Sequence, residues 1–370
     1  MKLGRLPLLA LSILALLAAL WAGLLRLGWA LPALEPGLFA AHGPLMVCGF
    51  LGTLISLERA VALGSRWCYA APALSAAGAL GLIVGAPDPT APVLITLGSL
   101  ALVANFAAII RRQAALFTIT MALGAAAWFA GNCLWLAGVP VLRMFPWWVG
   151  FLVLTIVGER LELSRLTGLG ERNRAPFLFG AAVFVTGLVV GLRAPAAGMR
   201  LAGAGLLAMA LWLGRYDLAR RTVRQTGLTR FIAANLLAGY VWLGAGGLAW
   251  LSFGGDLTAF HYDVILHTVF LGFVFSMIFA HAPIIFPAVT LRPLPYRAAF
   301  YLHSALLHVS LGLRLGGDLT GSYPAYRWGG LLNAITLLVF VGNSARAIAS
   351  GRRQPAAGAP PLRPAHEASG

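Results

Sequence analysis

Long apolar runs constrain the fold of this chain more than any other feature of its sequence. A helix that crosses the hydrocarbon core of a bilayer needs about 20 mostly apolar residues, and stretches of this kind follow one another along the chain. Only 10% of the residues are charged and the mean hydropathy is +0.85, whereas a soluble domain carries roughly 25% charged residues. We therefore predict an all-α fold, a polytopic integral membrane bundle of about twelve transmembrane helices.

The apolar segments fill one predicted membrane domain, residues 1–350, and leave no room for a soluble domain. The first segment is longer than the roughly 7–15 residues of a signal-peptide core, so we interpret it as a transmembrane helix. Residues 351–370 are rich in Pro, Ala and Gly, which predicts a disordered cytoplasmic tail. The expected helices are 6–28, 37–57, 68–86, 91–110, 114–138, 140–158, 176–192, 197–214, 230–252, 260–289, 297–316 and 327–349.

The basic residues follow the expected topology. With the N-terminus in the cytoplasm, 21 Lys and Arg residues fall on the cytoplasmic side of this scheme and 6 on the outer side. Such an asymmetry is typical of bacterial inner-membrane proteins, so we expect both termini in the cytoplasm and the lipid bilayer as the main partner. The formal net charge of +16 is explained in this way, without a nucleic-acid partner.

Several common site types find no support in the sequence. Cys48, Cys68 and Cys133 form neither a CxxC pair nor a zinc spacing, which argues against a disulfide framework and a structural zinc site. The chain also has no P-loop, no dinucleotide-binding glycine motif and no HExxH motif.

Histidines are the main candidates for a functional site. Six of the seven fall in only three expected helices, and ionisable residues inside membranes are usually functional. At 1.5 Å per residue, His42 and His267 lie about 8 Å and about 10 Å from the outer ends of their helices. Two imidazoles at similar depth can ligate one heme, or each can hydrogen-bond a carbonyl in a polar vestibule.

A second group of histidines lies deeper. His281, His303 and His308 are candidates for a second heme or a copper ion, and polar contacts between helices are the alternative. His303 and His308 are five residues apart, about 140° around a helix, so they do not share one face.

Other polar residues have candidate roles beside the histidines. Asp263 precedes His267 by four residues and lies on the same helix face, where it can accept the imidazole proton. Pro283 and Pro287 are expected to kink or break the helix after His281. Glu58 and Glu159 each precede an arginine at an inner helix end, a pattern that suits ion pairs or a point of proton uptake.

Two of the helices resemble a known family. The segment AAHGPLMVCGFLGTLI resembles the second helix of the heme–copper oxidase catalytic subunit, and FHYDVILHTVFLGFVFSMIFAHAPIIFP resembles its tenth. The resemblance implies that His42 and His267 are axial ligands of one heme, with Met46 and Asp263 beside them. That family's copper ligands come from helices six and seven, which contain no histidine here, so an oxygen-reducing centre of the usual kind is not expected.

The tenth helix also resembles a segment of the NnrS family of heme- and copper-containing membrane proteins, through His267, Gly272 and Met277. This resemblance implies a role in nitric oxide and denitrification stress or in electron transfer, with a redox partner protein. An enzyme of this kind would be an oxidoreductase acting on nitrogen oxides. The alternatives are a polytopic transporter, a metal or heme carrier, and an accessory factor of a respiratory complex.

Overall fold

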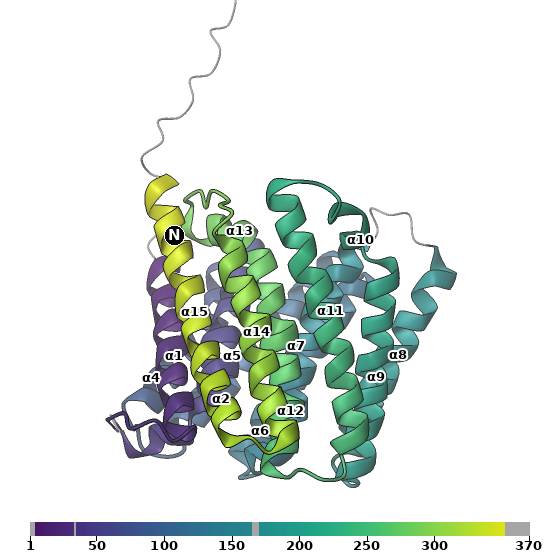
Figure 1. Cartoon of the computed structure of the whole chain (residues 1–370). Coiled ribbons are helices and arrows are strands. Elements are labelled where there is room, and N and C mark those ends of the chain that lie inside the picture. Colours follow the sequence, from purple (N-terminus) through teal and green to yellow (C-terminus); the bar gives the residue numbers. More distant parts are fainter. Residues whose placement is uncertain (1–3, 33–34, 165–169, 352–370) are drawn as a thin grey trace, which may run out of the picture.

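The computed structural model describes residues 4–32, 35–164 and 170–351, and this part of the chain is an α-helical bundle without strands (Figure 1), which confirms the predicted fold class. Successive long helices run in alternating directions. Helix α1 (Arg5–Arg26) begins, and α15 (Tyr323–Gly351) ends, at the same end of the bundle. We call this end the termini face and the other end the opposite face. The predicted tail, apart from Gly351, lies outside the described residues.

Ten helical stretches of the described chain are long and apolar enough to cross a membrane. Their lengths follow from the apolar runs, because a helix pairs its own backbone groups in lipid. The stretches are Arg5–Arg26, His42–Leu63, Thr90–Arg112 (α5), Leu116–Leu136 (α6), Val141–Leu163 (α7), Glu171–Val190 (α8), Pro195–Tyr216 (α9), Gly227–Phe253 (α11), Ala259–Thr290 and Tyr323–Ser350.

The predicted count of twelve is therefore corrected to about ten among the described residues. The two remaining expected segments, 68–86 and 297–316, are also helical, but they are not both long and apolar enough to cross a membrane. Helix α4 (Ala70–Ile83) has 14 residues, about 21 Å of helix against a hydrocarbon core of about 30 Å. Helix α14 (Phe300–Thr320) is long enough, but two histidines, Arg314 and Asp318 lower its hydropathy.

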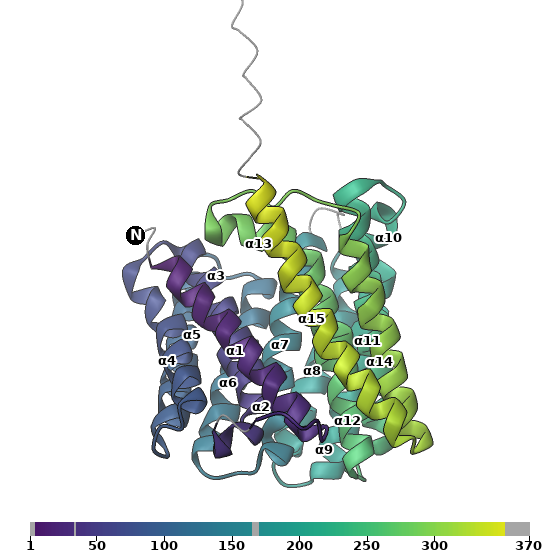
Figure 2. The same cartoon turned by 60° about the vertical axis from the view of Figure 1, so that its left-hand side comes forward.

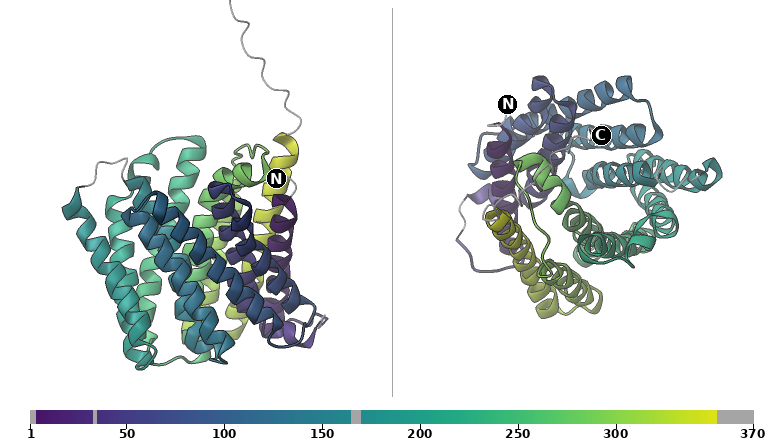
Figure 3. Two further views of the ribbon diagram at one scale, coloured as in Figure 1. Left: turned by 180° about the vertical axis from the view of Figure 1, so that it is seen from behind. Right: turned by 90° about the horizontal axis from the view of Figure 1, so that it is seen from above.

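The helices divide into central and peripheral ones. The membrane-crossing windows of His42–Leu63, α7 and Ala259–Thr290 are 61%, 72% and 67% buried inside the protein, against 28% for α8. Helices α6 and α7, α8 and α9, and α14 and α15 form extensive pairs. Helices α4 and α8 lie at opposite edges, as the views from the front and from behind show (Figures 1 and 3). The predicted histidine-bearing segments 37–57 and 260–289 are thus central helices.

Two of the central helices contain long π-helical segments. The stretch His42–Leu63 consists of α2 (His42–Pro44), the π segment η2 (Leu45–Gly52) and α3 (Thr53–Leu63). The stretch Ala259–Thr290 consists of α12 (Ala259–His267), the π segment η5 (Thr268–Phe275) and α13 (Ser276–Thr290). Each π segment begins within three residues of a histidine, and π-helical turns are frequent at functional sites.

The two prolines expected to kink or break the helix after His281 do not end it. Pro283 and Pro287 both lie inside α13, which continues to Thr290 before Leu291 adopts a left-handed conformation with φ of 57°. Each proline removes one backbone donor, and the surrounding helices tolerate this inside the bundle.

Helices α1 and α15 run side by side on the side of the bundle that faces the viewer in Figure 2.

Candidate functional site

His42 lies at the opposite-face end of its helix and is fixed by α1. Its Nδ1 atom is 2.8 Å from the carbonyl oxygen of Ala19. A carbonyl can only accept, so Nδ1 carries the proton and Nε2 is the unprotonated nitrogen. The ring lies against Gly23, where an added Cβ would come within 2.9 Å of it. The small residue at position 23 therefore allows α1 to approach the imidazole.

His267 is held from its own helix. Its Nδ1 atom is 3.0 Å from the carbonyl oxygen and 3.1 Å from Oδ1 of Asp263. The contact with the carboxylate is the one that the four-residue spacing predicts. As in His42, Nδ1 is the donating nitrogen, so in the neutral ring Nε2 is the one without a proton.

Arg314 on α14 completes this arrangement, and sequence reasoning missed it. Its Nε and Nη2 atoms donate to the two carboxylate oxygens of Asp263 at 2.8 and 2.7 Å. The expected topology counts Arg314 among the six outer basic residues, but it lies inside α14 and is 8% exposed. An isolated arginine within an apolar helix was the available signal, because such residues are usually paired.

A second acid lies one turn beyond Arg314. Asp318 is 5% exposed, and its carboxylate is an electrostatic neighbour of Asp263. Neither of its oxygens accepts a hydrogen bond from a donor in the described part of the chain. We call His267, Asp263, Arg314 and Asp318 the opposite-face cluster. It holds one more carboxylate than guanidinium.

The structure places His42 and His267 within electrostatic range of each other. His267, Arg26 and Arg314 are electrostatic neighbours of His42. The π segments that follow the two histidines face each other, because Phe50 and Phe275 stack with ring centroids 6.1 Å apart. Met46 is half-buried and packs against the surrounding core.

The two imidazoles suit metal ligation by their chemistry. In ligating histidines the second ring nitrogen normally donates to a carbonyl or carboxylate, which fixes the tautomer and raises the basicity of the ligating nitrogen. Both His42 and His267 meet this condition through Ala19 and Asp263. The residues present therefore fit a group that takes two imidazole ligands, such as heme iron.

A buried polar chain borders His42 on α6 and α7. Trp148 lies 3.9 Å from a Cβ added at Gly43 and donates its indole N–H to Asn132 at 2.8 Å. The Cys48 thiol donates to the same amide oxygen at 3.6 Å and accepts from Trp128 at 3.3 Å. The sequence analysis assigned these residues to no site.

The remaining histidines have separate surroundings. His281 donates to the carbonyl of Met277 at 2.7 Å. His303 is 2% exposed and lies among phenylalanine rings, with Phe279 at a centroid distance of 4.6 Å. His308 accepts from the Trp242 indole at 3.0 Å. In residues 4–32, 35–164 and 170–351, no three His, Cys, Asp or Glu side chains form a group that could hold a metal ion, so the second metal site stays a prediction.

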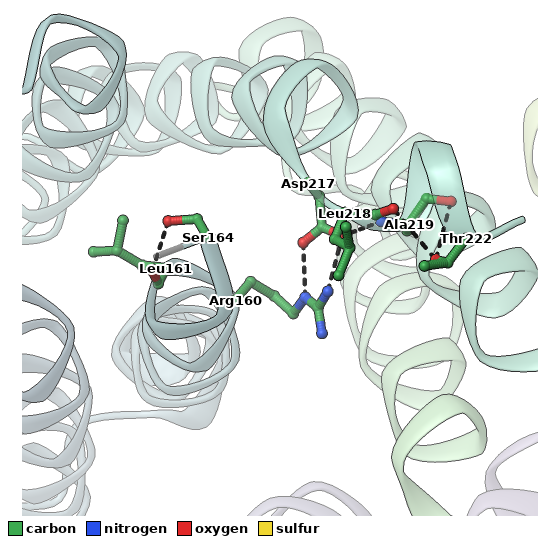
Figure 4. A network of polar contacts seen from close by, with 7 residues as sticks. All are labelled: Arg160, Leu161, Ser164, Asp217, Leu218, Ala219 and Thr222. Atoms are coloured by element: carbon green, nitrogen blue, oxygen red, sulfur yellow. Dashed lines mark hydrogen bonds and ion pairs between the residues drawn. The ribbon is translucent and has the colours of Figure 1, made fainter. Parts of the chain in front are cut away.

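A second set of charges, partly or fully buried, lies at the termini face. Arg59 donates to Glu58 at 3.0 Å and to Glu159 on α7. The neighbouring Arg160 forms a bidentate pair with Asp217, at 2.8 Å for both bonds (Figure 4). Asp217 also accepts from the backbone N–H of Ala219 at 2.7 Å, which ties the α9–α10 turn to α7; α10 is Ala219–Thr222.

We call Glu58, Arg59, Glu159, Arg160 and Asp217 the termini-face cluster. The predicted ion pairs at the inner helix ends are present, but they join different helices and not only neighbours in sequence. The Tyr240 hydroxyl of α11 lies beside the Arg160–Asp217 pair. Two helices, α3 and α7, and one turn are thus joined by ion pairs at this end.

These features define the class of the protein, an all-α integral membrane bundle with a buried polar cluster at each end. The chain belongs to a family described as a domain of unknown function, DUF8744, whose model matches residues 5–349. Comparison with curated proteins and with solved structures finds no match.

Proposed function

We propose that this protein is a membrane hemoprotein in which His42 and His267 are the axial ligands of one heme. One observation carries the proposal: the two imidazoles are electrostatic neighbours on two adjacent π-containing helices, and each has Nδ1 committed to a carbonyl. Nε2 of each ring is the nitrogen left to bind iron.

The residues of the chain would have distinct roles around this group. Ala19 and Asp263 fix the tautomers, and Arg314 holds the Asp263 carboxylate in place. When bound, the heme would supply one-electron redox chemistry, tuned by its two imidazole ligands and by their hydrogen bonds. The resemblance to the NnrS and heme–copper oxidase families favours a role in nitrogen-oxide stress or electron transfer, with a redox partner protein.

We further propose that the protein resides in a bacterial-type inner membrane with the termini face toward the cytoplasm. The excess of basic residues at this face supports this orientation. Arg160 and Arg314 are buried in ion pairs and do not contribute to the loop charge that sets it.

The test of heme binding is a visible spectrum and a heme assay of the protein purified from membranes in mild detergent. A heme Soret band at one heme per chain is expected, with loss of the band in His42→Ala and in His267→Ala. His261→Ala is the matched control, because His261 lies on the same helix as His267 but stacks on Phe253 and contacts Asp256. A colourless protein after growth and reconstitution with excess heme contradicts the proposal, as does a His261→Ala loss equal to that of the other two variants.

A further inference from the structure

The termini-face cluster holds more negative than positive charge. Glu58 and Glu159 both accept hydrogen bonds from Nη2 of the same guanidinium, Arg59. The neighbouring guanidinium of Arg160 is already committed to both carboxylate oxygens of Asp217. Two carboxylates therefore share one cation, and a fully ionised trio would carry one negative charge.

This trio is partly buried in the bundle. The side chains of Arg59, Glu58 and Glu159 are 13%, 28% and 22% exposed. A carboxylate held away from water without its own cation is costly, and such a group usually takes up a proton instead. Arg59 separates the two acids and would repel a metal cation, so a proton is the favoured partner.

The groups that face the trio do not supply the missing positive charge. Glu162 on α7 adds a further acid and is exposed. On α13, the His281 imidazole is an electrostatic neighbour of Glu58, but its Nδ1–H is directed to the Met277 carbonyl. The Asp217 carboxylate, after α9, is matched by Arg160.

Polar atoms line the same two helices one turn further into the bundle. Ser56 on α3 and Thr155 on α7 are buried, and their hydroxyls have no hydrogen-bond partner within the described residues; the same holds for Nε of Arg59. Groups of this kind bind water in protein interiors. Water at these positions would hydrate the inner side of the trio.

We infer that Glu58 and Glu159 share one exchangeable proton at neutral pH and, with Arg59, form a proton-binding site near the termini face. The site does not depend on heme. It is formed by residues of α3 and α7 alone, so it stands even where the proposed function fails.

Infrared spectroscopy of the full chain in lipid nanodiscs tests this inference, because a protonated carboxylic acid has a C=O stretching band that shifts in D2O. Wild-type-minus-variant difference spectra at neutral pH are expected to show loss of one such band in Glu58→Gln and equally in Glu159→Gln. In each variant the remaining acid pairs one-to-one with Arg59 and ionises. Glu162→Gln is the matched control and is expected to retain the band.

Thermal unfolding of each variant, monitored by tryptophan fluorescence, ensures that only folded protein is compared. The inference is overturned if neither folded variant loses the band, which means that both acids are ionised in the wild type or are bound to a metal cation. It is also overturned if only one variant loses the band, because the proton then belongs to a single residue and is not shared.

Discussion

The two buried charge clusters use the same device for different purposes. Each joins helices through a guanidinium that binds a carboxylate in a bidentate pair, and each holds one more carboxylate than guanidinium. In the opposite-face cluster the paired acid also binds a histidine ring, whereas in the termini-face cluster it accepts from the first backbone N–H of a short helix. A buried ion pair therefore indicates a functional site only where it also orients a group with chemistry of its own.

The largest expected effect is the loss of a bidentate pair. Arg314→Ala and Arg160→Ala are each expected to lower the free energy of unfolding by about 3–5 kcal/mol, because each leaves a buried carboxylate without its cation. Chemical unfolding in detergent measures the change. Replacing both partners, as in Arg160→Met with Asp217→Leu, is expected to recover most of the loss. A single-variant loss below about 1 kcal/mol would mean that water replaces the missing partner.

The second prediction separates the two clusters by function and rests on the proposed heme. Asp263→Asn weakens the hydrogen bond to His267, so heme affinity is expected to fall by about 10–100-fold. Asp217→Asn is expected to leave heme affinity unchanged, although it disturbs an equally buried pair. Heme titration of the apo protein measures both, and equal losses would show that stability alone governs binding.

The third prediction concerns the excess acid of the opposite-face cluster. Asp318→Asn is expected to raise the free energy of unfolding by about 1 kcal/mol, because the amide can donate to Asp263 without first taking up a proton. Thermal and chemical unfolding provide the measurement, with Asp256→Asn on the exposed surface as control. Destabilisation by Asp318→Asn would point to a bound cation between the two acids.

The smallest effect is expected at the shared arginine of the termini-face cluster. Glu159→Gln leaves Arg59 paired with Glu58, so the free energy of unfolding is expected to change by less than about 1 kcal/mol. This value sharpens the contrast with Arg160→Ala, whose site has a single acid. A loss comparable to that of Arg160→Ala would assign to Glu159 the main structural bond between α3 and α7.

Most of the fold was predictable from the apolar runs. The expected segments 91–110 and 197–214 correspond to Thr90–Arg112 and Pro195–Tyr216, because the thickness of the bilayer fixes helix length. The prediction of membrane-crossing helices from apolar runs failed at α4, which is too short, and at α14, which carries charges. Its charges become acceptable only through Asp263 on another helix.

The site was predictable only in part. Equal depth placed His42 and His267 on one level, and the four-residue spacing gave the contact between Asp263 and His267. The π segments after both histidines had no signal in the sequence, since their residues are as apolar as those of an ordinary membrane helix. The carbonyl partner of His42 also belongs to a different helix, 23 residues earlier in the chain.

By itself the sequence determined that this chain forms apolar helices of alternating direction, with a strong positive bias and histidines in few of them. Which charges pair was decided by the tertiary structure alone. Arg160 and Asp217 are 57 residues apart, and Arg314 and Asp263 are 51 apart. The partner of a buried side chain depends on how each helix is rotated and which helix lies beside it. Both are set by packing across the whole bundle and not by local pattern.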